Sequence, residues 1–249
     1  MNKGIFITVR TGSKRLPNKA LLRINGKTTI EYLIDRTKLS QLSNIIVLCT
    51  TILPEDDVLC EIANNNNINY YRGSVEDKLD RWKGACEKFN IDFFVTADGD
   101  DLFCEPYLMD LAFGQVETSD TDYIKADGIV CGAFTYGIKY TALKKVCDIK
   151  DTSDTEMMWT YFEDTGLFNI SQLAKIPVEY MRSDIRMTLD YEDDFKFFTN
   201  IIECFNGKIF GLMDILSYID KNPYVSKINI HLQDQWVANQ KKRTNLILK

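Results

Sequence analysis

The sequence predicts a single α/β domain in which a mixed, mostly parallel sheet is flanked by helices and carries a β-hairpin insertion. Two observations support this prediction. As far as Asp98, short apolar runs alternate with longer helical patterns, which is typical of parallel strands joined by helices. The chain has 249 residues, 45% of them hydrophobic, with neither an internal repeat nor a low-complexity linker, so one large core is expected.

The N-terminal part of the chain is expected to supply four strands and the three helices between them. Apolar runs short enough for buried strands lie at residues 5–9, 44–50, 68–71 and 93–97. Helical patterns lie between these runs at about 29–39, 55–64 and 75–89. The asparagine run at 64–67 predicts the end of the second helix, and Gly73–Ser74 predicts the entry to the third.

The pattern of elements changes beyond Asp98. Residues 122–125 and 129–138 are expected to pair as a hairpin around Asp127–Gly128, because Asp-Gly is a strong turn signal. Further helices are expected near residues 141–146, 155–163, 192–205 and 212–219. The main domain is therefore assigned to residues 1–224. Residues 225–249 have no clear period and are expected to be a C-terminal arm, an interface segment or a frayed end.

Composition excludes several classes of function. A formal net charge of −6 argues against general nucleic-acid binding, which needs a basic surface. No apolar stretch approaches the roughly 18 residues of a membrane span, and the first strand begins too early to leave room for a signal peptide. The seven cysteines form no C-x-x-C pair and His231 is the only histidine, which argues against zinc. A cytoplasmic protein with reduced thiols is expected.

A cationic loop, residues 10–19, follows the first predicted strand directly. Ligands of open α/β sheets bind at the carboxyl ends of strands, where this loop is expected to lie. Its cationic side chains could grip the oxygens of a polyanion, and its glycine allows a close backbone approach or a positive φ. A solvated surface turn is the alternative. The candidate phosphate-binding residues are Arg10, Gly12, Ser13, Lys14, Arg15 and Lys19.

Three aspartates, Asp98, Asp100 and Asp101, follow the predicted strand at 93–97. Carboxylates this close repel one another unless a cation neutralises them. Their oxygens suit Mg²⁺, which is usually bound by one or two carboxylates together with phosphate oxygens and water. The sequence therefore indicates a metal site at this position. The alternative is an aspartate-rich turn that caps a helix starting near Pro106.

A second acidic segment starts at Asp190, where a short strand is expected to end and a helix to begin. The dipole of a helix favours acidic side chains at its N-terminus. On these residues alone, Asp190 is an N-cap and the acids that follow it decorate the helix start.

The cationic loop and the first acidic cluster resemble signature elements of the cytidylyltransferases that make CMP-activated acidic sugars. These enzymes include CMP-sialic acid synthetases, CMP-Kdo synthetases and the SpsF-like proteins of spore coat polysaccharide synthesis. Residues 10–19 are similar to the family loop A-R-x-G-S-[KT]-R-L-P-x-K, with Val9 where those proteins usually have Ala. Gly99–Asp100 and Pro106 are similar to the element G-D-x-P-x-x-x-P, with Leu102 in place of a Pro.

The second acidic segment resembles a third element of these enzymes. Leu189–Asp190 and Asp194–Phe195 are similar to [LV]-D-x-x-x-D-[LF], which supplies a further metal-binding aspartate. The resemblance implies that Asp100 and Asp190 face each other in space and bind Mg²⁺, while Asp194 caps the helix or braces the site. It also implies that the cationic loop binds the nucleotide phosphates. The catalytic residues implied in this way are Lys19, Arg15, Asp100 and Asp190.

The segment 71–82 resembles the F-R-G-[SD]-x-x-D-x-L-x-R-[YW] element of SpsF-like proteins. In that family this region lies beside the nucleotide, so the resemblance implies that Arg72 and Asp77 are nucleotide ligands. The alternative is a capping box with Ser74 as the N-cap and Asp77 three residues later.

The resemblance implies a Rossmann-like (GT-A-like) fold and a nucleotidyltransferase domain at residues 1–224. The implied activity is the Mg²⁺-dependent transfer of CMP from CTP to a nonulosonic or ulosonic acid, or to a phosphonate or related acidic acceptor, with release of pyrophosphate. Its implied role is the synthesis of surface polysaccharides or glycoconjugates. Homodimers are common among these relatives, and residues 225–249 could contribute to one.

Two other functions stay open at this point. A metal-dependent glycosyltransferase would use a D-x-D motif to bind a sugar nucleotide, and Asp98-Gly99-Asp100 matches that short pattern. A non-catalytic nucleotide-binding module would keep the fold without turnover. Retention of both Asp100 and Asp190 argues against the second, because a module that only binds has no need of two metal-binding carboxylates.

Overall fold

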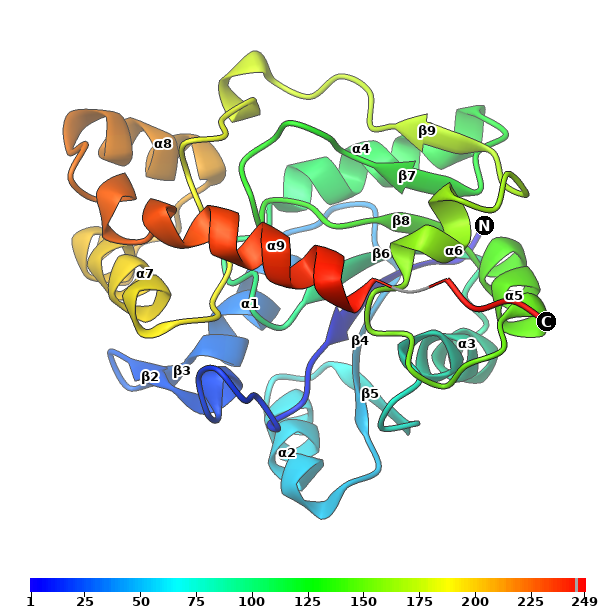
Figure 1. The fold of residues 1–249 in the computed structure, drawn as a ribbon. Coiled ribbons are helices and arrows are strands. Elements are labelled where there is room, and N and C mark those ends of the chain that lie inside the picture. Colours follow the sequence, from blue (N-terminus) through cyan, green and yellow to red (C-terminus); the bar gives the residue numbers. More distant parts are fainter. Residues whose placement is uncertain (245) are drawn as a thin grey trace.

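A seven-stranded mixed sheet lies at the centre of the computed structural model, which describes residues 1–244 and 246–249 (Figure 1). Its strands are β1 (Lys3–Thr8), β4 (Ile45–Thr51), β5 (Asn69–Gly73), β6 (Phe93–Asp98), β7 (Tyr123–Lys125), β8 (Gly137–Lys139) and β9 (Ile170–Gln172). They are arranged in the order β5-β4-β1-β6-β8-β7-β9. Strands β2 (Arg23–Ile24) and β3 (Lys27–Thr28) form a separate antiparallel pair.

The sheet is mostly parallel, as predicted. Strands β5, β4, β1 and β6 are parallel neighbours, and β7 is parallel to β9. Strand β8 is antiparallel to both β6 and β7. The helices are α1 (Thr29–Thr37), α2 (Asp57–Asn65), α3 (Lys78–Phe89), α4 (Pro106–Thr118), α5 (Tyr140–Ile149), α6 (Trp159–Glu163), α7 (Glu192–Phe205), α8 (Leu212–Lys221) and α9 (Gln233–Arg243).

Apolar residues cover both faces of the sheet because successive strand residues point to opposite sides. In β1, Ile5 and Ile7 pack into a core shared with α1, α2, α4, α7 and α8. Phe6, between them, belongs to a second core with α3 and α5. There its ring stacks on Phe94, with 4.4 Å between centroids, and Trp82 packs edge-on against Phe94 at 5.6 Å. This double burial explains why the strands read as continuous apolar runs.

The predicted tight hairpin is partly wrong. Strands β7 and β8 do pair antiparallel, but the long loop 126–136 connects them instead of a turn at Asp127–Gly128. The backbone of this loop is bonded elsewhere: Val130 N–H donates to the Tyr180 carbonyl at 2.9 Å, and the Cys131 carbonyl accepts from Met187 N–H at 2.9 Å. These contacts with distant segments take the place of a strand ladder.

Helix α6 is shorter than predicted, because it begins at Trp159 and not near Thr155. The hydroxyl of Thr155 donates to Asp77 at 2.9 Å and accepts from Leu79 N–H at 3.1 Å. Thr155 is therefore tied to the start of α3, and the chain cannot coil into a helix at this point.

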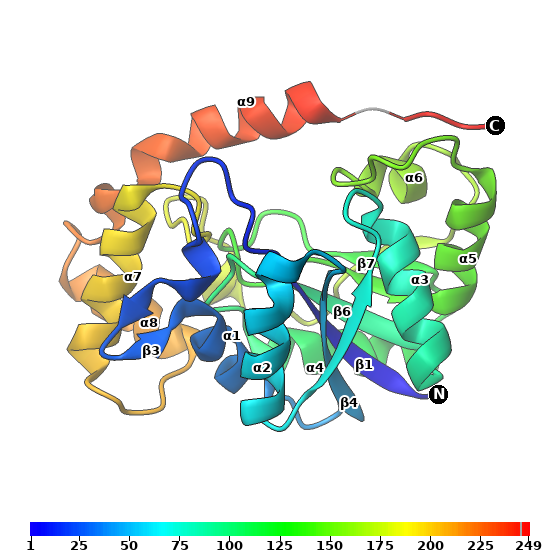
Figure 2. The ribbon, with the colours of Figure 1, turned by 90° about the horizontal axis from the view of Figure 1, so that it is seen from below.

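The C-terminal residues form an ordered arm that crosses the carboxyl ends of the strands. Two 3₁₀ turns, Ser226–Ile228 and Ile230–Leu232, lead into α9. Figure 2 shows α9 running over the top of the molecule, above the loop that follows β1. Beyond it, Ile247 and Lys249 pair with the end of α5 through Asp151 N–H to the Ile247 carbonyl and Lys249 N–H to the Ile149 carbonyl. Across the described ranges, no helix is long and apolar enough to cross a bilayer.

Candidate active site

A cavity of about 1300 Å³ opens at the carboxyl ends of β1 and β6. These strands are parallel neighbours in the register Thr8 to Asp98, so the loops that follow them leave the same edge of the sheet. Both predicted segments reach the cavity. Its walls include all six predicted phosphate-binding residues and four aspartates: Arg10, Gly12, Ser13, Lys14, Arg15, Lys19, Asp98, Asp100, Asp101 and Asp190.

Only a glycine fits where the two strand-end loops meet. A Cβ at Gly99 would lie 2.7 Å from the Cβ of Val9, and Gly99 N–H donates to the Thr8 carbonyl at 2.8 Å. Gly12 is different: it is not among the glycines with positive φ, and a Cβ there would meet nothing within 4 Å. The positive φ considered for Gly12 is therefore wrong. The space beside the Gly12 backbone is open, as the close approach of a ligand would require.

Asp100 and Asp190 both contact the ammonium group of Lys19. Lys19 Nζ lies 2.6 Å from Asp100 Oδ2 and 2.8 Å from Asp190 Oδ1. A backbone bond of 2.8 Å from Leu189 N–H to the Asp100 carbonyl holds the two acidic segments together. Arg15 adds a second cation, 2.6 Å from Asp190 Oδ1. The two carboxylates therefore face each other as the resemblance implied.

The charges of this cluster shift the pKa values of its members. Burial alone would raise the pKa of Asp190, but Lys19 and Arg15 override burial and lower the pKa to about 2. Burial dominates at Asp100 and raises its pKa against the pull of Lys19. The two carboxylates raise the pKa of Lys19, although burial opposes them. Lys19 is therefore the cation that keeps the acidic pair together.

The donor set fits a divalent cation that shares its coordination with a substrate. Asp190 Oδ2 is buried and accepts no hydrogen bond from any described residue, and Arg186 Nη2 lies 3.8 Å from it. Within residues 1–244 and 246–249, no three Asp, Glu, His or Cys side chains meet as a complete metal cluster. Two carboxylates completed by phosphate oxygens and water are the usual seat of Mg²⁺. The residues present therefore fit Mg²⁺ together with a phosphate ligand.

Asp194 braces Asp190 from below. Its Oδ2 accepts from the backbone N–H groups of Asp190 and Tyr191 at 2.9 and 3.0 Å. It also forms a two-pronged ion pair with the guanidinium of Arg186, at 2.9 and 3.2 Å. Both side chains are completely buried. The capping or bracing role considered for Asp194 is thus its role in the structure.

Two site residues were not singled out in the sequence analysis, although Arg81 matches the second arginine of the element at residues 71–82. Lys78, the first residue of α3, lines the cavity and pairs with Asp98 at 2.9 Å. Arg81 lines it one turn later, almost completely buried, with a bond of 2.7 Å to the Ser74 carbonyl and no hydrogen-bond partner for Nε. Both lie in the segment 71–82, which the resemblance placed beside the nucleotide.

Arg72 and Asp77 do not line the cavity in this structure. Arg72 lies on β5 and donates to the carbonyls of Thr51 and Leu53 at 2.9 and 2.8 Å. Asp77 is the N-cap of α3, accepts from Asp80 N–H at 3.0 Å and pairs with Lys150. Asp77 thus takes the capping position that was expected for Ser74. The structure therefore gives both residues positioning contacts.

A buried aspartate that the sequence analysis did not single out anchors the cationic loop. Asp56 Oδ1 accepts from the backbone N–H of Thr11 at 2.8 Å and from its hydroxyl at 2.7 Å. Its other oxygen accepts from the hydroxyl of Thr51 at the end of β4. Burial would raise the pKa of Asp56, but these hydrogen bonds lower it below its ordinary value. Asp56 therefore fixes the point where the loop leaves β1.

Replacing Asp56 with alanine is expected to lower the free energy of unfolding by about 3 kcal/mol, because several buried donors lose a charged acceptor. Urea denaturation at neutral pH measures this, with Asp57→Ala, whose carboxylate is largely exposed, as the matched control. Because the folded-state pKa of Asp56 is lowered, its contribution is present above its ordinary value of 3.8 and is lost as pH falls through the folded value. An equal difference between wild type and variant at low and neutral pH would contradict the assignment.

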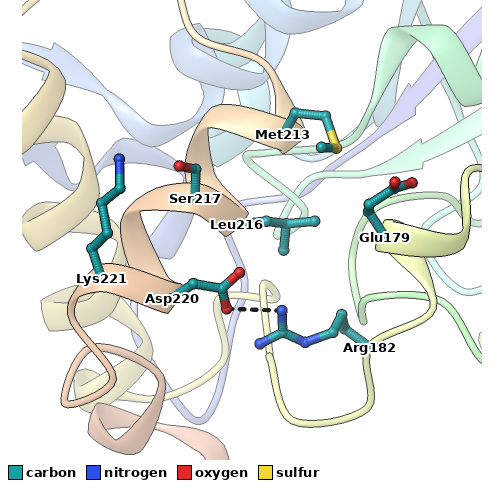
Figure 3. Close-up of a pocket in the computed structure, with 7 residues that line it drawn as sticks. All are labelled: Glu179, Arg182, Met213, Leu216, Ser217, Asp220 and Lys221. Carbon is teal, nitrogen blue, oxygen red and sulfur yellow. Dashed lines mark hydrogen bonds and ion pairs between the residues drawn. The ribbon is translucent and has the colours of Figure 1, made fainter.

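A second, smaller pocket lies between Val178–Tyr180 and α8 (Figure 3). It measures about 370 Å³ and shares no lining residue with the large cavity. Its one guanidinium, Arg182, is already paired with Asp220 at 3.0 Å and with Asp184 at 2.7 Å. The guanidinium is therefore neutralised within the protein, and the pocket holds none of the predicted site residues. The large cavity, which holds the cationic loop and the acidic pair, is the candidate active site.

Comparisons with known proteins agree with this site. The sequence matches the family model described as cytidylyltransferase over residues 5–227. It is 32% identical over 233 residues to an uncharacterised protein of Methanocaldococcus jannaschii, covering 92% of this chain and 95% of that protein. It is 23% identical over 204 residues to the spore coat polysaccharide biosynthesis protein SpsF of Bacillus subtilis, covering 79% and 85%.

A solved structure has the same fold. The cytidylyltransferase from Leptospira borgpetersenii superposes with a TM-score of 0.82 at 26% sequence identity, covering 90% of this chain and 96% of that one. The family match spans most of the chain, including the cationic loop and both acidic segments. The resemblance noted in the sequence is thereby confirmed, and the chain belongs to the cytidylyltransferase family.

Proposed function

We propose that this protein transfers CMP from CTP to an acidic sugar or a related acidic acceptor and releases pyrophosphate. The observation that carries the proposal is the meeting of Asp100 and Asp190 at Lys19, beside a cationic loop, in a member of the cytidylyltransferase family. The acceptor class of the proposal is a nonulosonic or ulosonic acid or a phosphonate. Synthesis of surface polysaccharides or glycoconjugates, a cytoplasmic location and a homodimer belong to the same proposal and rest on the resemblance.

The cationic loop is the proposed seat of the triphosphate. Arg15 and Lys19 are paired with carboxylates, and the phosphates of a bound nucleotide would compete with these carboxylates for the two cations. Arg10 lies 3.6 Å from Glu156. Lys14 has no ion-pair or hydrogen-bond partner anywhere in the described part of the chain, although it lines the cavity. These cations would orient the α-phosphorus for in-line attack and neutralise the pyrophosphate as it leaves.

Asp100 and Asp190 are the proposed ligands of Mg²⁺. The bound ion would neutralise phosphate charge and help to orient the acceptor oxygen. When nucleotide is present, Lys19 would turn its ammonium from the two carboxylates towards a phosphate oxygen, since it lies within 2.8 Å of both. Asp194 and Arg186 would keep Asp190 in place through the backbone bonds described above.

Replacing Lys14 with methionine is expected to raise the dissociation constant for CTP by roughly 10-fold, the loss that follows removal of one charge-assisted hydrogen bond. Isothermal titration of CTP with Mg²⁺ measures this. Lys83→Met on α3 is the matched control, because Lys83 lies outside the cavity wall. If both variants bound CTP with equal affinity, the assignment of Lys14 to the phosphate site would be wrong.

The proposed reaction is tested by pyrophosphate release in the presence of Mg²⁺. Each of the four ribonucleoside triphosphates is combined with a panel of acidic sugars and phosphonates that includes Kdo and N-acetylneuraminic acid. Release that requires both CTP and one acceptor supports the proposal. CTP binding without release for any acceptor, together with consumption of a sugar nucleotide, would support a glycosyltransferase instead.

A further inference from the structure

Helix α9 forms one wall of the candidate active site, although none of the sequence motifs lies on it. Figure 2 shows it crossing above the cationic loop. Four of its residues and the one that follows it are spaced so that a single face meets the cavity. The lining residues of this segment are Trp236, Val237, Gln240, Lys241 and Thr244.

The helix is held over the cavity by its ends. Before it, the fully buried Asn229 donates to the Arg186 carbonyl at 3.0 Å and to Asp194 at 2.9 Å. At its first residue, Gln233 accepts from Arg186 Nη1 at 3.1 Å. After it, residues 247–249 pair with the end of α5. No residue of 233–242 is fully buried, so α9 is not itself part of the apolar core.

Two buried polar atoms on the cavity face of α9 have no hydrogen-bond partner among the residues that the structure describes. They are Trp236 Nε1, which can only donate, and Gln240 Oε1, which can only accept. These residues are four apart, so they lie one above the other on the same face. Buried polar atoms are nearly always paired, and leaving one unpaired is costly. Their position on the cavity wall points to a ligand that carries both donors and acceptors.

The same face carries a cation without a partner. Lys241 Nζ has no ion pair or hydrogen bond within residues 1–244 and 246–249. The wall is also close to the proposed metal ligand: the Trp236 ring packs 5.2 Å from the Arg186 guanidinium, and Asn239 donates to the Tyr191 hydroxyl at 3.4 Å. Arg186 and Tyr191 flank Asp190 in the sequence.

We infer that α9 is an acceptor-binding wall, on which Trp236 and Gln240 bind hydroxyl groups of a polyhydroxylated acid and Lys241 binds its acidic group. The inference rests on the proposed function. The triphosphate carries several negative charges and suits the many cations of residues 10–19. A wall with one free ammonium, one neutral donor and one neutral acceptor suits a singly charged sugar acid instead. Hydroxyl groups, which donate and accept, satisfy both orphaned atoms.

The test compares Gln240→Ala with Gln235→Ala, the same change on the exposed side of the same helix. Trp236→Phe is added because it keeps the ring beside Arg186 and removes only the N–H donor. Wild type and variants are assayed for pyrophosphate release with CTP, Mg²⁺ and the acidic sugar of the panel, such as Kdo or N-acetylneuraminic acid, that the wild type uses. KM is measured separately for acceptor and for CTP, and CTP affinity by titration confirms that each variant is folded.

Trp236→Phe and Gln240→Ala are each expected to raise the KM for the acceptor about fivefold, the effect of one lost neutral hydrogen bond. The KM for CTP is expected to stay unchanged in both variants, and Gln235→Ala is expected to change neither KM. An unchanged acceptor KM in both variants overturns the inference and leaves the proposed function intact. A shift confined to the KM for CTP also overturns it, because α9 would then bind the nucleotide. Release with a phosphonate alone overturns the inference and leaves the proposed function intact. Absence of release by the wild type with every acceptor of the panel contradicts the proposed function and, with it, the acceptor wall.

Discussion

The Asp100→Asn variant is expected to lose at least about 99% of turnover, a 100-fold loss typical of removing one preorganised charge from an active site. Its fold is expected to stay intact. Burial and the nearby carboxylates of Asp190 and Asp98 raise the pKa of Asp100, so its negative charge costs folding stability and its removal relieves that cost. Thermal unfolding at pH 7 should therefore give a midpoint equal to that of the wild type or above it.

Asp190→Asn provides the matched comparison, because it removes the other carboxylate from the same ammonium. The loss of turnover should be similar, but the stability effect should have the opposite sign. The pKa of Asp190 is lowered to about 2, so its charge stabilises the folded state above pH 3.8 and this stability is lost as pH falls through 2. Asp190→Asn should cost about 2 kcal/mol at neutral pH. Near-normal turnover in either variant would contradict the metal assignment.

The Asp194→Ala variant is expected to lose about 4 kcal/mol of folding stability, the largest effect on stability that we predict. Removal of Asp194 leaves Arg186, which is completely buried, without its two-pronged partner. A buried charge that loses its partner costs about 3–5 kcal/mol. The backbone N–H groups of Asp190 and Tyr191 lose their acceptor as well.

Denaturant unfolding measures this effect, with Asp193→Ala as the control. Asp193 is the preceding residue and its carboxylate is exposed, where it pairs only with surface groups, Lys196 and His231. Its removal should change stability by less than about 1 kcal/mol. Similar losses for the two variants would show that Asp194 is not the anchor of Asp190.

The central sheet and the acidic pair could be predicted because both correspond to patterns of residues that are close together in the sequence. Strands buried on both faces give continuous apolar runs, and β1, β4 and β6 lie within a residue or two of the predicted ranges. The convergence of Asp100 and Asp190 followed from motifs at the two strand ends. Their shared partner, Lys19, belongs to the same cationic loop that the sequence singled out.

Other parts of the site depend on contacts that no local pattern records. Asp56 anchors Thr11, and Lys78 pairs with Asp98, across long separations in the sequence. Arg72 is long enough to reach several partners, and the carbonyls at the end of β4 are nearer than the cavity. Helix α9 is held in place by contacts at its ends and has no apolar stripe. The hydrophobic periodicity of the sequence therefore could not reveal it.

The most direct test of cytidylyl transfer is phosphorus-31 NMR of the protein with CTP, Mg²⁺ and each acid of the acceptor panel. With a sugar acid we expect the three CTP resonances to be replaced by pyrophosphate and by one phosphodiester resonance, which would show that the α-phosphorus has moved to the acceptor. With a phosphonate the product resonances would instead be the two coupled ones of a phosphonate–phosphate anhydride. CTP that stays intact with every acceptor, or that yields free CMP without any CMP–acceptor product, would contradict the proposed reaction.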